Sequence, residues 1–134
     1  NPAFIKSIET LQTPWQLSSF TIAAVKEMIS FAKNTSWFSD EIKKVIAERD
    51  RMFLKINSVL QNKYVIFPSM ANFILIKSIE SKQHKSLLEA CFKNGVMIKD
   101  LSGEKGLENC IRVTVGRLEE NLLFEKSFKE SILN

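Results

Sequence analysis

A lysine and an arginine on two short predicted strands are the residues of this chain whose chemistry stands out. Lys99 and Arg112 lie within residues 95–116, where a glycine-bearing loop joins the two strands. Arg112 interrupts an apolar alternation over residues 111–115, so it points away from any core that this alternation faces. Periodicity alone would leave such an arginine in solvent. A guanidinium can also present two parallel donors to a carboxylate, which is the binding chemistry that Arg112 offers.

Two predicted helices precede these strands. The first begins after Pro14 and carries an apolar stripe with helical spacing, and the second begins near Ser39, which offers a cap before an acidic first turn. We expect each helix to pack along one side. The first stripe consists of Leu17, Phe20, Ala24, Val25, Met28 and Phe31, and the second of Ile42, Val45, Ile46, Phe53, Ile56 and Leu60.

Short strands and helices alternate over the rest of the chain. Residues 64–67 and 72–77 have strand composition and are separated by a turn at Pro68, which indicates a hairpin or a paired edge. The apolar residues Leu87, Leu88, Cys91 and Phe92 predict a short helix next, and Asn94 and Gly95 end it in the manner of a left-handed cap.

Two more strands are predicted over residues 96–99 and 110–115, and a last helix begins after Gly116. Together these elements predict an α+β fold of two layers, with helices on one face of a small, mostly antiparallel sheet. A ferredoxin-like arrangement would share the pattern. Many unrelated activities use such layers, so the fold by itself assigns no function.

Composition is typical of a soluble globular protein. The length of 134 residues is typical of a single domain, and 45% of the residues are apolar and 25% are charged. No basic-then-apolar leader opens the chain and the apolar runs are strand-sized, so we expect a cytoplasmic protein without a membrane segment. Because the chain opens with Asn1 and no initiator methionine, we expect it to be a fragment of a longer polypeptide.

Charge and cysteine usage argue against two other classes of function. The net charge is +4, but the cations are dispersed among acids, whereas nucleic-acid binders cluster them, so we expect no nucleic-acid partner. Cys91 and Cys110 have no second cysteine pair and His84 is the only histidine, which excludes the usual zinc spacings. We interpret both cysteines as small buried hydrophobes and His84 as a residue on a solvated helix face.

Several segments resemble one enzyme family. Residues 68–73 (Pro-Ser-Met-Ala-Asn-Phe) resemble its proline-small-x-Ala-Asn-Phe element. Residues 95–100 (Gly-Val-Met-Ile-Lys-Asp) resemble its Gly-apolar-apolar-apolar-Arg-Asp segment, and a Gly-Leu at residues 106–107 precedes the strand Ile-Arg-Val-Thr-Val-Gly at residues 111–116. Together they resemble histidinol-phosphate aminotransferases and the related threonine-phosphate decarboxylases, which are fold-type I enzymes that depend on pyridoxal phosphate.

The resemblance implies that three residues bind substrate. Arg112 matches the arginine that holds the carboxylate of the amino-acid substrate. Lys99 stands where the family usually has an arginine that helps to hold the substrate phosphate, so the charge is kept and the planar fork is lost. Asn72 could orient backbone near the mouth of the active site, or its amide could merely satisfy a turn.

A division of the chain is implied as well. Residues 1–2 resemble the point just after the cofactor-lysine segment, and residues 14–15 (Pro-Trp) resemble the start of the long helix between the two domains. We therefore expect an interdomain linking helix in residues 1–34 and an aminotransferase small domain in residues 35–134, with the large cofactor-binding domain absent.

The family's Ser-x-Ser-Lys segment, whose lysine carries the cofactor, does not occur in the sequence. We therefore expect no catalytic, cofactor-binding or metal-binding residue in this chain, and an isolated fragment that is inactive. The resemblance implies that the full-length protein binds pyridoxal phosphate, transfers an amino group between a phosphorylated amino compound and a 2-oxo acid, and forms a homodimer.

Two other interpretations stay open. A threonine-phosphate decarboxylase is favoured by Trp15, whereas the intact strand at residues 111–116 favours the transaminase. A stand-alone ligand-binding module of ferredoxin-like layout would share the fold without the chemistry. A Ser-x-Ser-Lys segment shortly upstream of Asn1 would distinguish the enzyme from such a module.

Overall fold

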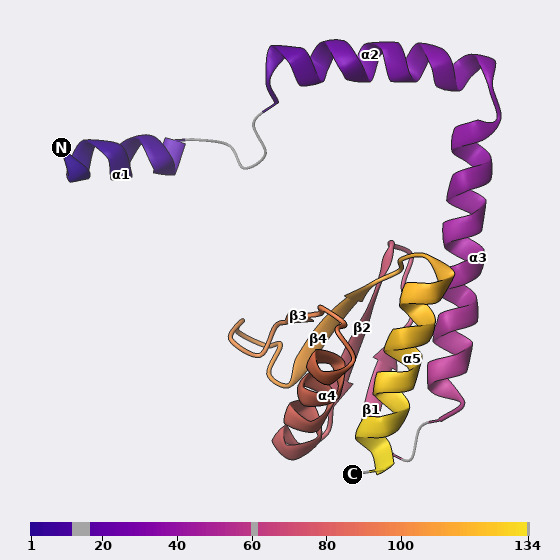
Figure 1. Ribbon diagram of the computed structural model, residues 1–134. Helices are drawn as coiled ribbons and strands as arrows, with labels where there is room; N and C mark the ends of the chain where they lie inside the picture. The colour runs from indigo at the N-terminus through magenta and orange to yellow at the C-terminus, as the bar shows by residue number, and fades with distance from the viewer. Residues whose placement is uncertain (12–16, 60–61, 134) are drawn as a thin grey trace. The chain divides into compact units, whose positions relative to one another are not determined.

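The computed structural model describes residues 1–11, 17–59 and 62–133. The chain divides into two compact units, Asn1–Asp40 and Glu41–Asn134, which we call unit 1 and unit 2. Unit 1 is helical where it is described, and unit 2 combines helices with a sheet; their elements are labelled in Figure 1.

Unit 1 contains α1 (Pro2–Leu11), α2 (Ser19–Asn34) and the start of α3 (Trp37–Asn57). Ser18 caps α2, because its hydroxyl oxygen accepts a hydrogen bond from the Thr21 N–H at 3.1 Å. Such a bond satisfies one of the donors that the first turn of a helix leaves unpaired.

The sequence prediction omits α1 and is wrong about the packing of α2. Apolar residues from Phe4 to Leu11 recur at helical spacing, a signal that the prediction did not use. No residue of α1 or α2 is buried. The predicted stripe from Leu17 to Phe31 is largely exposed, because no described element of unit 1 covers it. The predicted start of that helix at Pro14 lies outside the described residues.

Unit 2 contains a four-stranded sheet in the order β1-β2-β4-β3, and every neighbouring pair is antiparallel. The strands are β1 (Tyr64–Phe67), β2 (Phe73–Ser78), β3 (Lys99–Asp100) and β4 (Cys110–Thr114). The fold class predicted from the sequence, α+β with a small antiparallel sheet, is confirmed.

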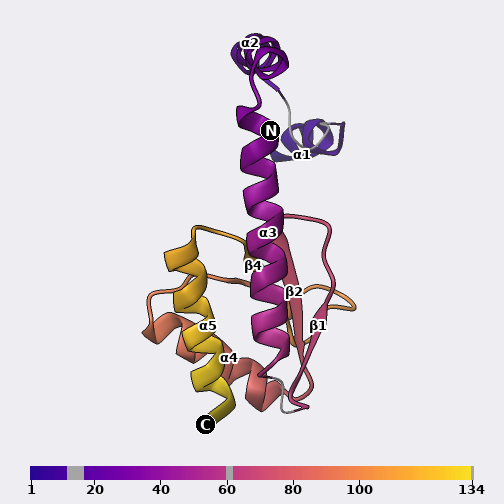
Figure 2. The same ribbon diagram turned by 90° about the vertical axis from the view of Figure 1, so that its right-hand side faces the viewer.

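Helices cover one face of this sheet. α4 (Ser81–Lys93) and α5 (Leu118–Leu133) lie side by side in both ribbon views, and the second half of α3 adds Met52 and Ile56 to the same core (Figures 1 and 2). The core comprises Met52, Ile56, Tyr64, Ile66, Ile74, Ile76, Leu87, Cys91, Ile111, Val113, Val115, Phe124, Phe128 and Ile132.

β3 is shorter than the strand predicted over residues 96–99. The Val96 N–H donates to the carbonyl oxygen of Cys91 at 2.8 Å, so Val96 belongs to the turn that ends α4. Gly95, with a φ of 71°, supplies the left-handed conformation of this turn. Pairing with β4 begins only at Lys99.

The predicted core face of α3 is wrong in its first half. The structure buries Arg49, Met52 and Ile56, whereas Ile42 and Ile46 are exposed. Among the described residues, polar contacts between α3 and α5 begin at Glu48, so the earlier turns of α3 within unit 2 extend beyond the part that α5 holds. Val45 is likewise exposed and Phe53 is half-buried, while Leu60 lies outside the described residues.

An ionic network fastens α3 to α5. Arg51 Nη2 lies 2.8 Å from Glu48 Oε1 and 2.5 Å from Glu125 Oε1, and Asn121 Nδ2 donates to Glu48 Oε1 at 2.9 Å. Asn121 Oδ1 also accepts the Gly116 N–H at 2.9 Å, which ties the network to the turn after β4. The hydrogen bond from Arg51 is the main cause that lowers the pKa of Glu48.

We predict that Arg51→Met lowers the free energy of unfolding by about 1 to 2 kcal/mol, because it leaves two carboxylates without their cation. Since folding lowers the pKa of Glu48, this contribution is present above about pH 5 and is lost as the pH falls through the folded-state pKa. Denaturant unfolding at neutral and acidic pH measures both effects.

The matched control is Lys126→Met on α5. Lys126 and Glu130 form an exposed pair at 3.9 Å, so this substitution should change the unfolding free energy by less than about 0.5 kcal/mol. Equal effects of the two substitutions would show that the Arg51 network does not stabilise unit 2.

Candidate anion-binding site

Lys99 and Arg112 occupy directly paired positions on neighbouring strands. Their Cα atoms are register partners in the antiparallel pair of β3 and β4, and Arg112 faces Leu75 of β2 on its other side. Residues directly opposite in an antiparallel pair project from the same face of the sheet. Ile111 and Val113 are buried and Arg112 is only half-buried, which agrees with the alternation in the sequence.

The face that carries these two cations is the one that the described helices of unit 2 leave uncovered. Its register positions include Phe67 on β1 and Leu75 on β2, in line with Arg112 and Lys99. Phe67 is 40% exposed, and α4 and α5 pack on the other face (Figure 2). Across this face, the apolar residues Phe67 and Leu75 therefore stand on β1 and β2, and the two cations stand on β4 and β3.

Phe73 supports Arg112 from the same face. The centre of the guanidinium lies over the Phe73 ring, 5.1 Å from the ring centroid. A cation over an aromatic face gains about 0.5 to 1 kcal/mol at an exposed site, and the ring restricts where the guanidinium can lie. Sequence reasoning did not select Phe73, although its place directly after Asn72 and two residues before Leu75 was a usable signal.

Lys99 and Arg112 have no acidic partner in the part of the chain that the structure describes. The carboxylate nearest in sequence to Lys99, that of Asp100, belongs to the opposite face of β3, where Asp100 pairs with Ile111. Like charges directly opposite each other on two strands are destabilising, by about 0.2 to 1 kcal/mol. An anion bound between them would remove that repulsion.

Asn72 is exposed in the turn that precedes β2. The turn is closed by Ser69, whose Oγ accepts the Ala71 N–H at 3.0 Å, and the Asn72 carbonyl oxygen accepts the Val115 N–H at 2.8 Å. The Asn72 side-chain amide makes no hydrogen bond to any described residue, so it is not needed for the turn. The structure places it next to Phe73 but records no contact with Lys99 or Arg112.

His84 contradicts the sequence prediction of a solvated histidine. It is 5% exposed, and its Nε2 lies 3.0 Å from Asp100 Oδ1. α4 begins at Ser81 and places His84 on the same buried helix face as Leu87 and Cys91. That spacing was the signal the prediction missed.

The remaining candidate chemistry is weak. Cys91 and Cys110 are buried and free, and burial raises the pKa of Cys91 to about 12, which keeps it a thiol at neutral pH. The described residues hold no group of three or more His, Cys, Asp or Glu side chains that could bind a metal. No described helix is both long and apolar enough to cross a membrane.

Comparison with known proteins decides the family. The model of the family described as aminotransferase class I and II matches residues 1–123. The chain belongs to this family.

Relatives and solved structures of the aminotransferase family span much longer chains. A protein named histidinol-phosphate aminotransferase 2 from Nitrosococcus oceani is 32% identical over 96% of this chain, which covers 34% of that relative. A decarboxylase from Sulfurospirillum multivorans shares the fold, with a TM-score of 0.71, 21% identity, and coverage of 100% of this chain and 37% of that one. An L-threonine-O-3-phosphate decarboxylase from Porphyromonas gingivalis has a TM-score of 0.62 and 25% identity, covering 96% and 38%. The chain thus spans about a third of the length of the relatives it matches.

Class I and II aminotransferases generally use pyridoxal phosphate. Among the described residues, the cavities of about 460, 330 and 280 Å³ are lined by neither Lys99 nor Arg112. Within unit 2, the two cations lie on the sheet face opposite to α4 and α5.

Proposed function

We propose that this chain is the substrate-binding portion of a pyridoxal-phosphate-dependent aminotransferase of the histidinol-phosphate aminotransferase type. The supporting observation is the placement of Arg112 directly opposite Lys99 on the uncovered sheet face, without an acidic partner among the described residues. In this proposal residues 1–34 link two domains, residues 35–134 form the small domain, and a large domain completes a cytoplasmic homodimer.

Arg112 would bind the carboxylate of the amino-acid or 2-oxo-acid substrate. Its guanidinium can offer two parallel N–H donors, which fixes both the position and the orientation of a carboxylate. The contact with the Phe73 ring restricts where the guanidinium can lie. A fixed carboxylate lets an enzyme present one bond at the α-carbon to its cofactor and reject other orientations.

Lys99 would bind the substrate phosphate as a point charge. It is exposed, it stands beside Arg112, and the nearby Asp100 carboxylate is engaged with His84 on the other side of the strand. An ammonium group binds less directionally than a guanidinium. The placement of the Lys99 ammonium therefore depends on the position of β3. Asn72, which is exposed in the turn before β2, is a third candidate contact.

Pyridoxal phosphate, when bound in the full-length protein, would supply the electron sink that amino-group transfer requires. The residues of this chain would bind, orient and discriminate substrates. None of them is proposed to exchange a proton with the reacting atoms.

A threonine-phosphate decarboxylase is the second candidate. The likeness to the Porphyromonas gingivalis decarboxylase at 25% identity favours it, and so does Trp15. Both candidates need cations for a phosphate and a carboxylate. Product analysis distinguishes them, because the decarboxylase releases carbon dioxide while the transaminase moves nitrogen to a 2-oxo acid.

In the full-length protein, Arg112→Ala should remove about 1.5 to 3 kcal/mol of substrate binding, the range for a hydrogen bond to a charged group. A loss of roughly 10- to 150-fold in kcat/KM should follow. Arg112→Lys should restore only part of it, because one ammonium cannot copy the fork. Unchanged kcat/KM in the alanine variant would show that Arg112 is a solvated strand residue.

Lys99→Ala in the full-length protein should reduce activity on phosphorylated substrates far more than on their dephosphorylated analogues, because only the former carry the group that Lys99 binds. Lys99→Arg should be tolerated. The measurement is the ratio of kcat/KM for the two substrate types in wild type and both variants. A solvated lysine would change both activities equally and by under about 1 kcal/mol, leaving the ratio constant.

The 134-residue chain alone should fold but should not attach pyridoxal phosphate through a lysine or transfer amino groups, because the Ser-x-Ser-Lys segment is not in its sequence. Absorbance after borohydride reduction, followed by mass spectrometry, measures covalent attachment at stoichiometric cofactor. A single stoichiometrically modified lysine would contradict this assignment and place the cofactor site in this chain.

A further inference from the structure

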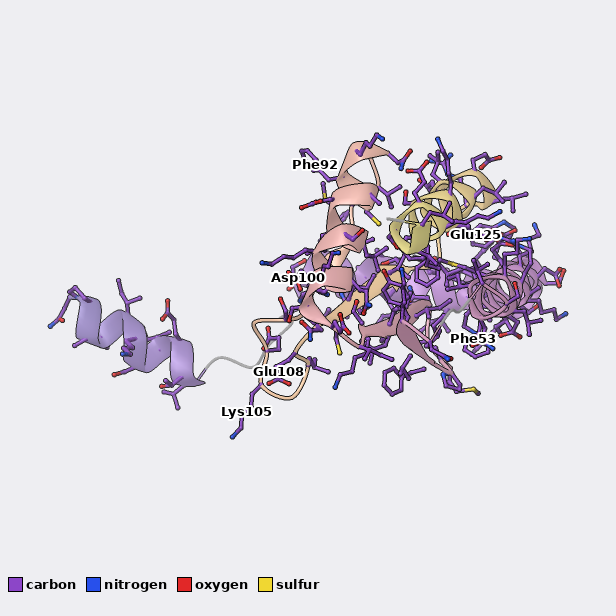
Figure 3. The ribbon with its side chains drawn as sticks, turned by 90° about the horizontal axis from the view of Figure 1, so that it is seen from below. Phe53, Phe92, Asp100, Lys105, Glu108 and Glu125 are labelled. Carbon is purple, nitrogen blue, oxygen red and sulfur yellow. The ribbon has the colours of Figure 1, made fainter. Side chains whose placement is uncertain are left out.

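The hydrogen bond between His84 and Asp100 connects the helical layer to the edge strand that carries Lys99. His84 belongs to α4 and is 5% exposed, and its Nε2 lies 3.0 Å from Asp100 Oδ1. Asp100 pairs with the buried Ile111, so its side chain projects from the helix-covered face of β3. In Figure 3, Asp100 is labelled beside α4.

In the hydrogen bond between His84 and Asp100, His84 is the donor. Burial alone would raise the pKa of Asp100, but hydrogen bonds from Ser102 and the nearby His84 outweigh it and lower that pKa. An ionised carboxylate only accepts hydrogen bonds, so Nε2 must donate. His84 Nδ1 is buried and has no partner among the described residues, so Nε2 alone makes the polar connection of this ring.

β3 has little else to hold it in place. It is two residues long and lies at the edge of the sheet, paired only with β4. Beyond it, the Leu101 N–H donates to the Cys110 carbonyl oxygen at 2.9 Å, and the Ser102 N–H donates to Asp100 Oδ1 at 2.9 Å. Asp100 Oδ1 is therefore hydrogen-bonded both to the loop after β3, through Ser102, and to α4, through His84.

The orientation of Lys99 depends on the same strand. Successive residues of a strand point to opposite faces, so anchoring Asp100 against α4 directs Lys99 to the uncovered face. We propose that His84 is a positioning residue, which holds Asp100 and thereby keeps Lys99 opposite Arg112. Its effect on substrate rests on the function proposed above; its effect on the strand does not.

Two substitutions separate hydrogen bonding from side-chain volume. In His84→Gln the amide nitrogen can occupy the place of the imidazole Nε2 and donate to Asp100. In His84→Asn the amide reaches only the place of Nδ1, so the hydrogen bond is lost. Because Nδ1 has no partner among the described residues, the glutamine variant gives up no hydrogen bond that the structure records.

The first readout is amide hydrogen exchange in the 134-residue chain. Under native conditions, His84→Asn should speed exchange at the Leu101 amide about tenfold or more relative to Ile76 in the sheet centre, because a hydrogen bond to a charged group is lost locally. His84→Gln should stay within about threefold of wild type. Equal acceleration at both amides, or none in the asparagine variant, would overturn the positioning role.

The second readout is substrate preference in the full-length protein. His84→Asn should lower the ratio of kcat/KM for phosphorylated to dephosphorylated substrate, as Lys99→Ala does. In His84→Gln this ratio should stay close to that of the wild type. If Lys99→Ala lowers the ratio and His84→Asn does not, the inference is overturned while the proposed function stands. If Lys99→Ala has no effect, the phosphate role of Lys99 fails, and the exchange result alone then shows whether His84 holds β3.

Discussion

The described helices of unit 2 pack against one face of its four-stranded sheet, and the side chains of each strand alternate between this face and the opposite one. Ile74, Ile76 and Ile111 project into the helical layer and supply the buried area that stabilises the unit. Their neighbours Leu75 and Arg112 must project the other way. Cations can therefore stand on the uncovered face without being buried, and the register of β3 and β4 sets them opposite each other.

The alternation in the sequence was sufficient to predict this face. β1 matched its predicted residues, β2 was shifted by one residue, and the orientation of Arg112 followed from its apolar neighbours. Such predictions succeed because strand periodicity is local and the apolar residues of each strand specify one face. The pairing of Lys99 with Arg112 could not be predicted in the same way, since it depends on where the loop after β3 lets the two strands meet.

Helix packing was predicted less well, for a physical reason. A helical stripe shows which side of a helix is apolar and leaves open what covers it, so the stripe of α2 and the first turns of α3 remain exposed in this chain. Buried polar groups were also missed. Asn121 and His84 are among the least exposed residues of unit 2, yet each is polar and is held by partners distant in sequence.

These buried polar contacts also explain how a site on an open surface can be precise. Arg112 lies on an inner strand between β2 and β3 and has the Phe73 ring beneath it, so its position follows from the sheet itself. Lys99 lies on a two-residue edge strand, and an ammonium on a flexible stem finds its partner less directionally than a guanidinium. β3 therefore needs a further contact with the helical layer to fix its position. Asp100, on the opposite face of that strand, meets His84 of α4, so the polar contact in the helical layer and the cation on the open surface are adjacent residues of one short strand.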